Sequence, residues 1–364
     1  MADEFGQWIE QRKIIIFLGS GGVGKTSCSL GFAVKLAREG KTVGLLSIDP
    51  ARRLAAALGV NLGSELQNVE FGLKNPLKGK LMACMLDQKA VFDKMVEQHA
   101  PDEITAKNIL KNRLYIAASE KLAGVGEYMA LAKLQEMIDM KFFDLIILDT
   151  PPETHALDFL QRPNILSGFM ERKIINWLVK PFHMTGRFGI ERIFSVGEHL
   201  MGGLSKITGF QTLYAISEFI LLMQQVIEGF HSSGEKIKKT LAKSDSGFVL
   251  VSVCQNASLR SGRYLSRQLV SLGYSLDGVF FNRSLPNAVE KNIHKIESEK
   301  PNRMTYLSKQ ISQRARTEWK MSSEFIAEIV ALQSNCPFKK KIPEYDEGLH
   351  SDRSIYRFSF SFDS

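Results

Sequence analysis

A glycine-rich run near the N-terminus carries the clearest chemical signal in the chain. It consists of Gly19, Ser20, Gly21, Gly22, Val23, Gly24, Lys25, Thr26 and Ser27. This run matches G-x-x-x-x-G-K-[ST], in which glycines let main-chain N–H groups turn inward around phosphate oxygens. In that pattern Lys25 reaches the β- and γ-phosphates, and Thr26 offers a hydroxyl to Mg²⁺. The run therefore predicts a site for a nucleotide and its magnesium ion.

Two acidic residues follow apolar segments elsewhere in the chain. Asp49 comes directly after residues 43–48, and Asp149 directly after residues 145–148. In open α/β sheets, ligands bind beyond the carboxyl ends of the strands, so both acids are expected beside the phosphates. Asp149 has the form of a Walker-B carboxylate that holds Mg²⁺ through water, with Thr26 as the other residue at the ion. Asp49 is a candidate to orient or deprotonate the attacking water, with Lys25 as the second catalytic group, although both acids also suit a helix N-cap.

The elements that must position these residues alternate between strands and helices. Ile14–Leu18 is apolar throughout, as a strand buried on both faces should be, and a helix is expected over Lys25–Glu39 with Gly40 after its end. Further strands are expected at residues 43–48, 81–86, 145–149, 248–254 and 278–282, and a helix at 260–272. This order predicts an α/β fold: a doubly wound, mostly parallel sheet of the P-loop NTPase type with a helical insertion.

Two helical stretches interrupt the alternation. Residues 89–140 have a helical pattern with a break at Pro101, and residues 163–243 are helical and poor in charge. We expect one P-loop ATPase domain over residues 1–364, with a helical subdomain at about 163–243 inserted in it and a shorter helical region at about 89–140. The apolar faces from Ser195 to Gly234 suit either a groove for an apolar client helix or packing within the protein or a dimer.

Composition limits the class of protein. The chain has 364 residues, of which 44% are apolar and 24% charged, as in globular proteins. Its net charge of +8 suits an acidic partner or scattered lysines, and because no dense basic block occurs, nucleic acid is not expected. Four widely spaced cysteines without a CxxC pair argue against zinc. Neither a signal peptide nor a membrane-spanning run is found, which predicts a cytoplasmic protein.

Three segments together resemble one family. Gly-Ser-Gly-Gly-Val-Gly-Lys-Thr, Ser-Ile-Asp-Pro-Ala-Arg-Arg-Leu and Asp-Thr-Pro-Pro-Glu-Thr-His-Ala-Leu-Asp-Phe-Leu are similar to the arsenical pump ATPases (ArsA). That family includes the eukaryotic ATPase that guides tail-anchored membrane proteins. The sequences of the second and third segments look most similar to those of bacterial single-domain members. Two weaker matches are Lys341–Leu349, which contains Pro343 and resembles the adenine loop, and Asn282, which resembles the adenine-reading asparagine. An asparagine in a turn is the alternative for Asn282.

The resemblance implies an ATPase that hydrolyses ATP to ADP with Mg²⁺ and works as a homodimer. Its partners would be a hydrophobic client helix, a membrane protein or a transport partner. One departure concerns the family's signature lysine, which reaches across the dimer and is replaced here by Ser20. Serine is uncharged and too short for that contact. We hypothesise that Arg52 or Arg53 supplies it instead, the alternative being that both are surface residues.

A positioning or partition ATPase of the MinD/ParA type is the second interpretation. That class normally keeps the signature lysine and often ends in a basic amphipathic helix. Phenylalanine and serine alternate at the end of Ser354–Phe362, a pattern typical of a strand, so no such helix is expected. A metabolic kinase is disfavoured because no further acid–base constellation is present, and GTP is disfavoured because no N-K-x-D stretch occurs.

Overall fold

The chain is described here by a computed structural model. It describes residues 2–49, 51–71, 77–121, 125–151, 239–242, 245–286, 305–333, 335–345 and 351–363, with single residues and two pairs, 288–289 and 291–292, between these ranges. The protein divides into two compact units, each with its own internal contacts. We call them the sheet unit (Met1–Leu86, Lys133–Gln161 and Lys239–Ser364) and the helical unit (Asp87–Ala132 and Arg162–Lys238).

An eight-stranded sheet forms the centre of the sheet unit, in the order β3-β4-β2-β5-β1-β6-β7-β8. The strands are β1 (Ile14–Leu18), β2 (Thr42–Ser47), β3 (Gln67–Asn68), β4 (Lys80–Met85), β5 (Leu145–Asp149), β6 (Ser246–Ser252), β7 (Gly278–Ser284) and β8 (Phe338–Pro343). Every neighbouring pair is parallel except β3 and β4. Strand β1 lies between β5 and β6 and is buried along its whole length. The predicted mostly parallel, doubly wound sheet is confirmed.

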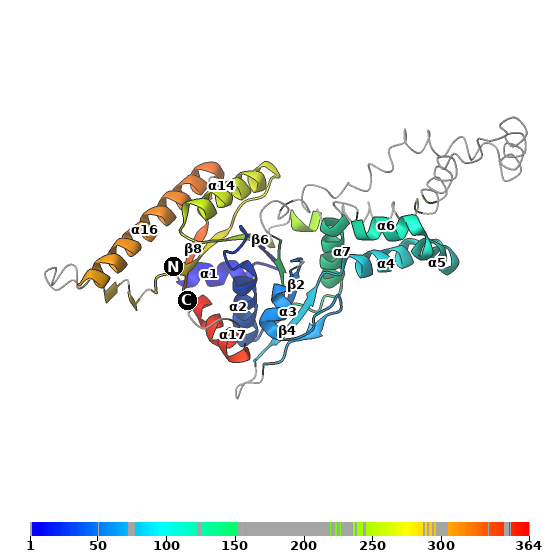
Figure 1. Ribbon diagram of the computed structural model, residues 1–364, viewed down its shortest axis with the longest axis horizontal. Coiled ribbons are helices and arrows are strands. Elements are labelled where there is room, and N and C mark those ends of the chain that lie inside the picture. The colour runs from blue at the N-terminus through cyan, green and yellow to red at the C-terminus, as the bar shows by residue number, and fades with distance from the viewer. Residues whose placement is uncertain are drawn as a thin grey trace, which may run out of the picture. The chain divides into compact units, whose positions relative to one another are not determined.

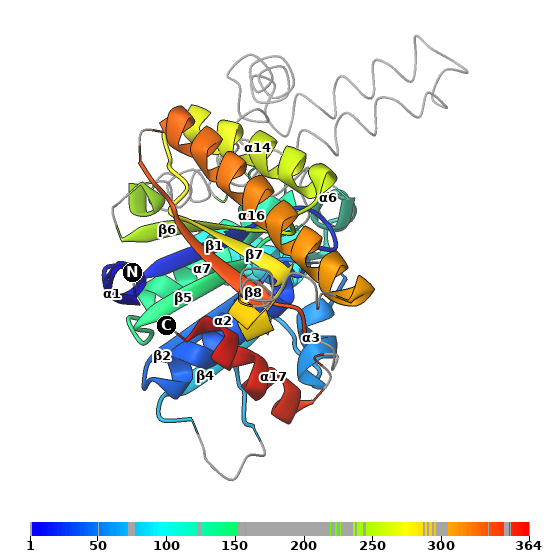
Figure 2. The same ribbon diagram turned by 90° about the vertical axis from the view of Figure 1, so that its left-hand side faces the viewer.

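Helices cover both faces of this sheet. Helix α2 (Lys25–Arg38) packs against α17 (Asp352–Ser359), and α14 (Asn256–Ser271) packs against α16 (Tyr306–Gln333). The first pair lies on one side of the sheet and the second pair on the other (Figures 1 and 2). Two shorter helices, α1 (Ala2–Glu10) and α3 (Arg53–Leu58), also belong to this unit. Gly40, expected after the end of α2, follows the C-cap and has a φ of 106°.

The C-terminal segment is helical, so the strand expected there is wrong. Residues 352–359 form α17 and Phe360–Phe362 form a 3-10 turn, η3. Ser351 and Ser354 close a reciprocal capping box at the start of α17. At helical spacing Phe358 and Phe362 share one face and are buried, whereas Phe360 is 48% exposed. The alternating pattern misled because it arises from two faces of a helix.

This helix is part of the hydrophobic core. The rings of Phe358 and Phe362 lie where a side chain on Gly31 of α2 would collide with them. Phe362 also lies 5.9 Å from Phe32 and 5.4 Å from Phe280, measured between ring centroids. Since its apolar face is covered by α2, α17 is not a free amphipathic helix.

The helical unit contains α4 (Gln88–His99), α5 (Glu103–Lys111), α6 (Arg113–Lys121) and the first half of α7 (Val125–Asp139). The break expected at Pro101 separates α4 from α5, and Asp102 caps α5 by accepting the N–H of Thr105 at 2.7 Å. Inside the unit, the buried Tyr115 donates a hydrogen bond of 2.6 Å to Asp93.

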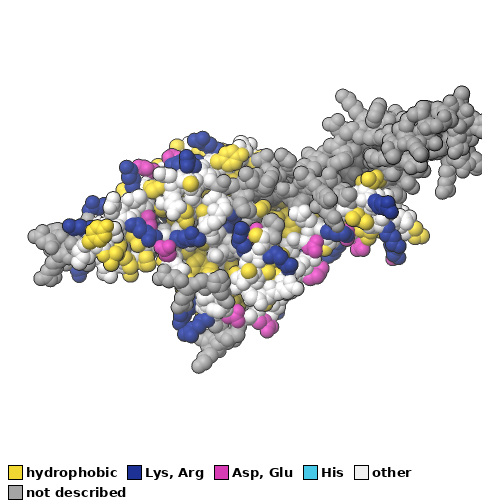
Figure 3. Space-filling view, in the orientation of Figure 1, with side chains coloured by type: hydrophobic (Ala, Val, Ile, Leu, Met, Phe, Trp, Pro, Cys, Tyr) yellow, Lys and Arg dark blue, Asp and Glu magenta, His cyan; other side chains and the backbone are white. Residues whose placement is uncertain are grey.

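Two other sequence expectations fall mainly on residues that the structure does not describe. The charge-poor stretch 195–234, with the groove expected on it, lies outside them apart from single residues, and so does most of 163–243. Among the helices that the structure describes, none has the length and apolar character that crossing a bilayer requires. On the face in Figure 3, the Lys and Arg side chains of the described residues are scattered rather than gathered in one patch.

Candidate nucleotide site

The glycine-rich loop joins β1 to α2 at the carboxyl end of the sheet. Gly19 and Gly24 have φ values of 149° and 87°, which favour glycine. A side chain at Gly19 would collide with the carbonyl oxygen of Val251, and one at Gly24 with the amide of Asn282. Both positions therefore require glycine, because other segments of the protein lie too close for a side chain and because the backbone conformation disfavours other residues.

Lys25 folds back over this loop. Its Nζ donates to the carbonyl oxygens of Gly19, at 2.8 Å, and Ser20, at 3.0 Å, and the side chain is buried. The Ser20 hydroxyl lies 3.4 Å from that of Ser258, so an uncharged hydrogen bond links the loop to α14. The ammonium group thus lies within the turn of the loop.

Asp149 is fully buried at the end of β5, where Thr26 and Ser47 converge on it. Its Oδ2 accepts hydrogen bonds from Thr26 Oγ1 at 2.8 Å and from Ser47 Oγ at 3.0 Å. Burial raises the pKa of Asp149 to about 6, although both hydrogen bonds and the charge of Lys25 lower it. The sequence analysis missed the role of Ser47. The available signal was its place at the end of β2, directly opposite Asp149 in the sheet register.

The surroundings of Asp149 fit a hard divalent cation. Its other oxygen, Oδ1, is buried and has no hydrogen-bond partner among the described residues. Magnesium prefers oxygen ligands and is commonly held by one or two protein side chains plus substrate phosphates. In the described ranges no cluster of three or more His, Cys, Asp or Glu could hold a metal by itself. Thr26 and Asp149 therefore suit an ion that arrives with a phosphate ligand.

Asp49 lies at the end of β2 and is only 4% exposed. Its Oδ1 accepts the N–H of Ala51 at 3.1 Å, and its Oδ2 accepts from the guanidinium of Arg53 at 2.8 Å. Arg52 points elsewhere and donates to Asn61 Oδ1 at 3.0 Å and to the Leu62 carbonyl at 2.7 Å. Of the two arginines considered from the sequence, Arg53 is the one whose guanidinium group contacts the carboxylate of Asp49.

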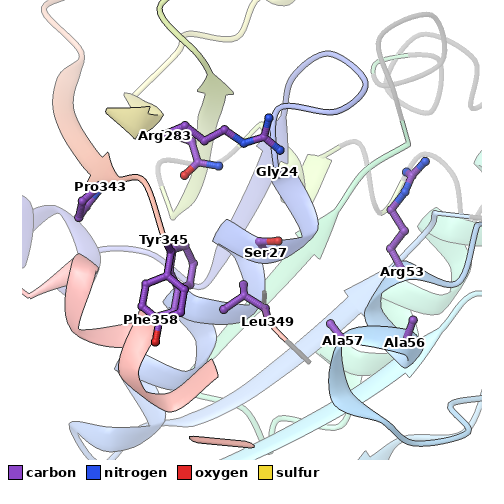
Figure 4. A pocket seen from close by; sticks show the side chains of 11 residues that line it. Gly24, Ser27, Arg53, Ala56, Ala57, Arg283, Pro343, Tyr345, Leu349 and Phe358 are labelled. Atoms are coloured by element: carbon purple, nitrogen blue, oxygen red, sulfur yellow. The ribbon is translucent and has the colours of Figure 1, made fainter. Parts of the chain in front are cut away.

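A cavity of about 400 Å³ begins at the end of the loop (Figure 4). It is lined by Gly24, Ser27, Arg53, Ala56, Ala57, Asn282, Arg283, Pro343, Tyr345, Leu349 and Phe358. Tyr345 and Phe358 lie together at one end, with ring centroids 5.8 Å apart, and Ser27 lies between this aromatic end and Arg53. The cavity thus extends from the glycine-rich loop to an aromatic wall that suits a flat ring system.

Both residues assigned to adenine from the resemblance line this cavity. Asn282 lies inside β7 rather than in a turn, and its Nδ2 donates to the Val23 carbonyl at 2.9 Å. Pro343 ends β8. Three parts of the lining were missed from the sequence: Arg283, Phe358 and the α3 pair Ala56 and Ala57. None belongs to a motif; β7 carries Arg283 to the cavity, while α17 and α3, which both pack against α2, carry the other three.

Comparisons with known proteins agree with this geometry. The model of the family described as Anion-transporting ATPase matches residues 12–334. The chain is 27% identical over 274 residues to ATPase get3 of Schizosaccharomyces japonicus, a match that covers 75% of each chain. It is 26% identical over 260 residues to ATPase get3 of Aspergillus terreus, covering 71% of this chain and 68% of that one. With ATPase GET3 of Rhodotorula glutinis the identity is 30% over 208 residues, or 57% and 55% of the two chains.

Proposed function

Because the chain belongs to the anion-transporting ATPase family, we propose that it is a dimeric, ATP-hydrolysing switch that handles a membrane-associated client or transport partner. The observation that supports it most is the convergence of Lys25, Thr26 and Asp149 on one glycine-rich loop. ATP and ADP would be its nucleotide ligands, with Mg²⁺ as cofactor.

The loop 19–27 would hold the phosphates. Its main-chain N–H groups and the first turn of α2 present partial positive charge to anions. The Lys25 ammonium now bonds to two loop carbonyls, and phosphate oxygens would replace these as stronger, charged acceptors. Lys25 therefore needs only a small movement to bind a triphosphate.

Thr26 and Asp149 would hold the magnesium ion. When bound beside these two residues, the ion would supply positive charge that neutralises the charge developing on the phosphates. Ser47 and Thr26 keep Oδ2 of Asp149 engaged, which orients the carboxylate and leaves Oδ1 available. Ionisation of Asp149 strengthens this contact, because a metal ligand must be deprotonated.

Asp49 would orient the attacking water and accept its proton. Since Arg53 occupies one of its oxygens at 2.8 Å, the pair must loosen before Asp49 can do so. A bound γ-phosphate would compete with Asp49 for the Arg53 guanidinium. Once it is bonded to the γ-phosphate, this guanidinium would stabilise the charge that develops in the transition state. In this way Arg53 would supply part of the positive charge at the phosphates that the family's signature lysine provides and that Ser20 cannot.

The aromatic end of the cavity would hold the adenine base. Tyr345 and Phe358 offer ring surfaces for stacking, and Asn282 and Pro343 border the same space. Adenine is preferred over guanine here on the resemblance of this segment to the adenine loop.

We also propose the assembly and the setting of this switch. On the resemblance to the arsenical pump ATPases, we propose a homodimer that acts in the cytoplasm on a hydrophobic client helix or membrane protein. The charge-poor residues 195–234 are the proposed client contact. We keep the single P-loop domain over 1–364 with helical regions at about 163–243 and 89–140 as the proposed organisation. Light scattering with ADP and with a non-hydrolysable ATP analogue tests the dimer.

A positioning ATPase is less well supported. Such proteins commonly attach to membranes by a terminal helix, and in this chain the apolar face of α17 is already packed on α2. Co-sedimentation with liposomes in the presence of ATP separates the two functions.

Phosphate release by the purified protein tests the ATPase proposal. We expect hydrolysis that requires Mg²⁺, stops with EDTA and is lost in Thr26→Ala. The matched control is Thr317→Ala on α16, which removes an exposed hydroxyl that bonds only within its helix at 2.8 Å. Equal activity of the Thr26→Ala variant and the control would contradict the assigned magnesium site.

A further inference from the structure

Arg283 is a charged residue in the lining of the cavity, and it belongs to no sequence motif. It directly follows Asn282 and lines the same space as Gly24 and Ser27. Figure 4 shows its side chain extending from β7 so that the guanidinium group lies beside Gly24. The cation is therefore at the end of the cavity that meets the glycine-rich loop.

The backbone at Arg283 is held in an unusual conformation. Its φ of 54° lies in the left-handed region, which costs free energy for any residue other than glycine. The β7–β8 register shifts between Phe281 and Ser284, and such irregularities redirect side chains next to functional sites. The irregular strand here turns the guanidinium out of the sheet and into the cavity.

A clamp on the far side of the strand keeps this conformation in place. Arg314 of α16 donates to the Arg283 carbonyl at 2.9 Å, and its guanidinium also bonds to Glu318 at 2.8 Å and Glu344 at 3.0 Å. The N–H of Glu344 in turn donates to the Ser284 carbonyl at 2.9 Å. Arg283 is thus fixed through its main chain while its side chain stays available.

The charge of Arg283 is not balanced locally. The cavity lining contains two cations, Arg53 and Arg283, and no carboxylate. Arg53 is paired with Asp49, whereas the Arg283 guanidinium has no hydrogen-bond or ion-pair partner among the described residues. Its field reaches the first turn of α2: burial raises the pKa of the Cys28 thiol, and the charge of Arg283 counteracts that rise.

We propose that Arg283 binds the phosphate chain of the nucleotide, at the phosphate nearest the ribose. The assignment rests on the proposed function and adds to it a second cation from the same chain, on the opposite side of the loop from the switch residue Arg53. The guanidinium lies beside Gly24, where the loop passes into α2 and the cavity toward the aromatic wall begins, and the phosphate nearest the ribose would lie at this junction. A guanidinium group suits this role because its planar fork can donate two parallel hydrogen bonds to one phosphate.

Replacement by glycine separates binding from folding at this position. Arg283→Gly removes the guanidinium while keeping a residue that favours positive φ, so the thermal midpoint should stay equal or rise. We expect the variant to bind Mg²⁺–ADP about tenfold more weakly in calorimetry, with a shallower dependence on salt. Arg283→Lys keeps the charge without the fork and should recover part of the loss. The control, Arg260→Ala on the exposed surface of α14, should bind like wild type.

The outcomes distinguish this inference from the proposed function. Wild-type affinity in both Arg283 variants, with binding by the unmodified protein intact, would overturn the role of Arg283 alone. Absence of Mg²⁺–ADP binding by the unmodified protein would overturn the proposed function and this inference with it. Weaker binding that is accompanied by an equal fall in thermal midpoint for Arg283→Gly and Arg283→Lys would assign Arg283 a structural role instead.

Discussion

The two ends of the nucleotide cavity are built in opposite ways. At the end proposed to hold the phosphates, the loop 19–24, Lys25 and Thr26 are consecutive in the sequence, and main-chain N–H groups would make many of the contacts. At the base end, Asn282, Tyr345 and Phe358 come from β7, from the chain after β8 and from α17. The family match over residues 12–334 includes all of the first end but stops before Tyr345 and Phe358.

The two ends are expected to differ in what they contribute: the loop end to hydrolysis, and the aromatic end to selection of the nucleoside. Binding by main-chain amides requires particular glycines and tolerates little change, because Gly19 and Gly24 each face neighbouring atoms at contact distance. Stacking on rings requires only that apolar side chains reach the cavity, and β8 and α17 deliver them through packing. We therefore expect changes at the phosphate end to stop turnover, and changes at the base end to alter affinity for the nucleoside.

The largest effect is expected for Asp49→Asn. Loss of the carboxylate that orients water should lower kcat about 1000-fold, while ATP binding remains within about threefold of wild type. Single-turnover phosphate release and calorimetry on the same sample measure the two effects. Unchanged kcat would remove Asp49 from the mechanism.

The neighbouring arginines provide a matched pair at the same end. Arg53→Ala should lower kcat about 100-fold, because Arg53 is the cation that faces Asp49 and the cavity. Arg52→Ala should leave kcat unchanged and lower the thermal midpoint by a few degrees, because the Arg52 guanidinium donates to the Asn61–Leu62 segment and not to Asp49. Equal kcat values for the two variants would contradict the division of roles.

At the base end, Tyr345→Leu should weaken ATP binding about tenfold, the loss expected for one ring in contact with a base. Binding of inorganic tripolyphosphate, which lacks a base, should not change. Tyr264→Leu is the control, since Tyr264 is 57% exposed on α14 and outside the cavity. A loss of tripolyphosphate binding in Tyr345→Leu would erase the proposed separation of the two ends.

The smallest effect concerns pH. Because burial raises the pKa of Asp149 to about 6, this group becomes protonated as pH falls through that value and then cannot hold a metal. The Mg²⁺-dependent part of ADP affinity should fall about fourfold from pH 7.5 to 5.5. Titrations in EDTA correct for protonation of the nucleotide itself. A Mg²⁺ contribution that stays constant over this range would argue against Asp149 as a ligand.

The elements around the glycine-rich loop were predicted from the sequence better than Arg283 and the C-terminal helix, which also line the cavity. Strand β1 and helix α2 were predicted at their observed starts because an unbroken apolar run and a glycine motif mark them. Arg283 could not be anticipated, since its side chain reaches the cavity only through a strand irregularity. The helix α17 was mistaken for a strand because burial of Phe358 and Phe362, four residues apart, is decided by contact with α2.

Calorimetry of the purified protein with Mg²⁺ and a non-hydrolysable ATP analogue tests the central claim most directly, with Lys25→Ala as the variant. We expect saturable uptake by the unmodified protein and by Lys320→Ala, whose lysine is 72% exposed on α16. For Lys25→Ala we expect affinity lowered about 100-fold, because a buried charge partner of the phosphates is removed. No uptake by the unmodified protein, or equal uptake by Lys25→Ala, would contradict the claim that this loop and its lysine capture the triphosphate.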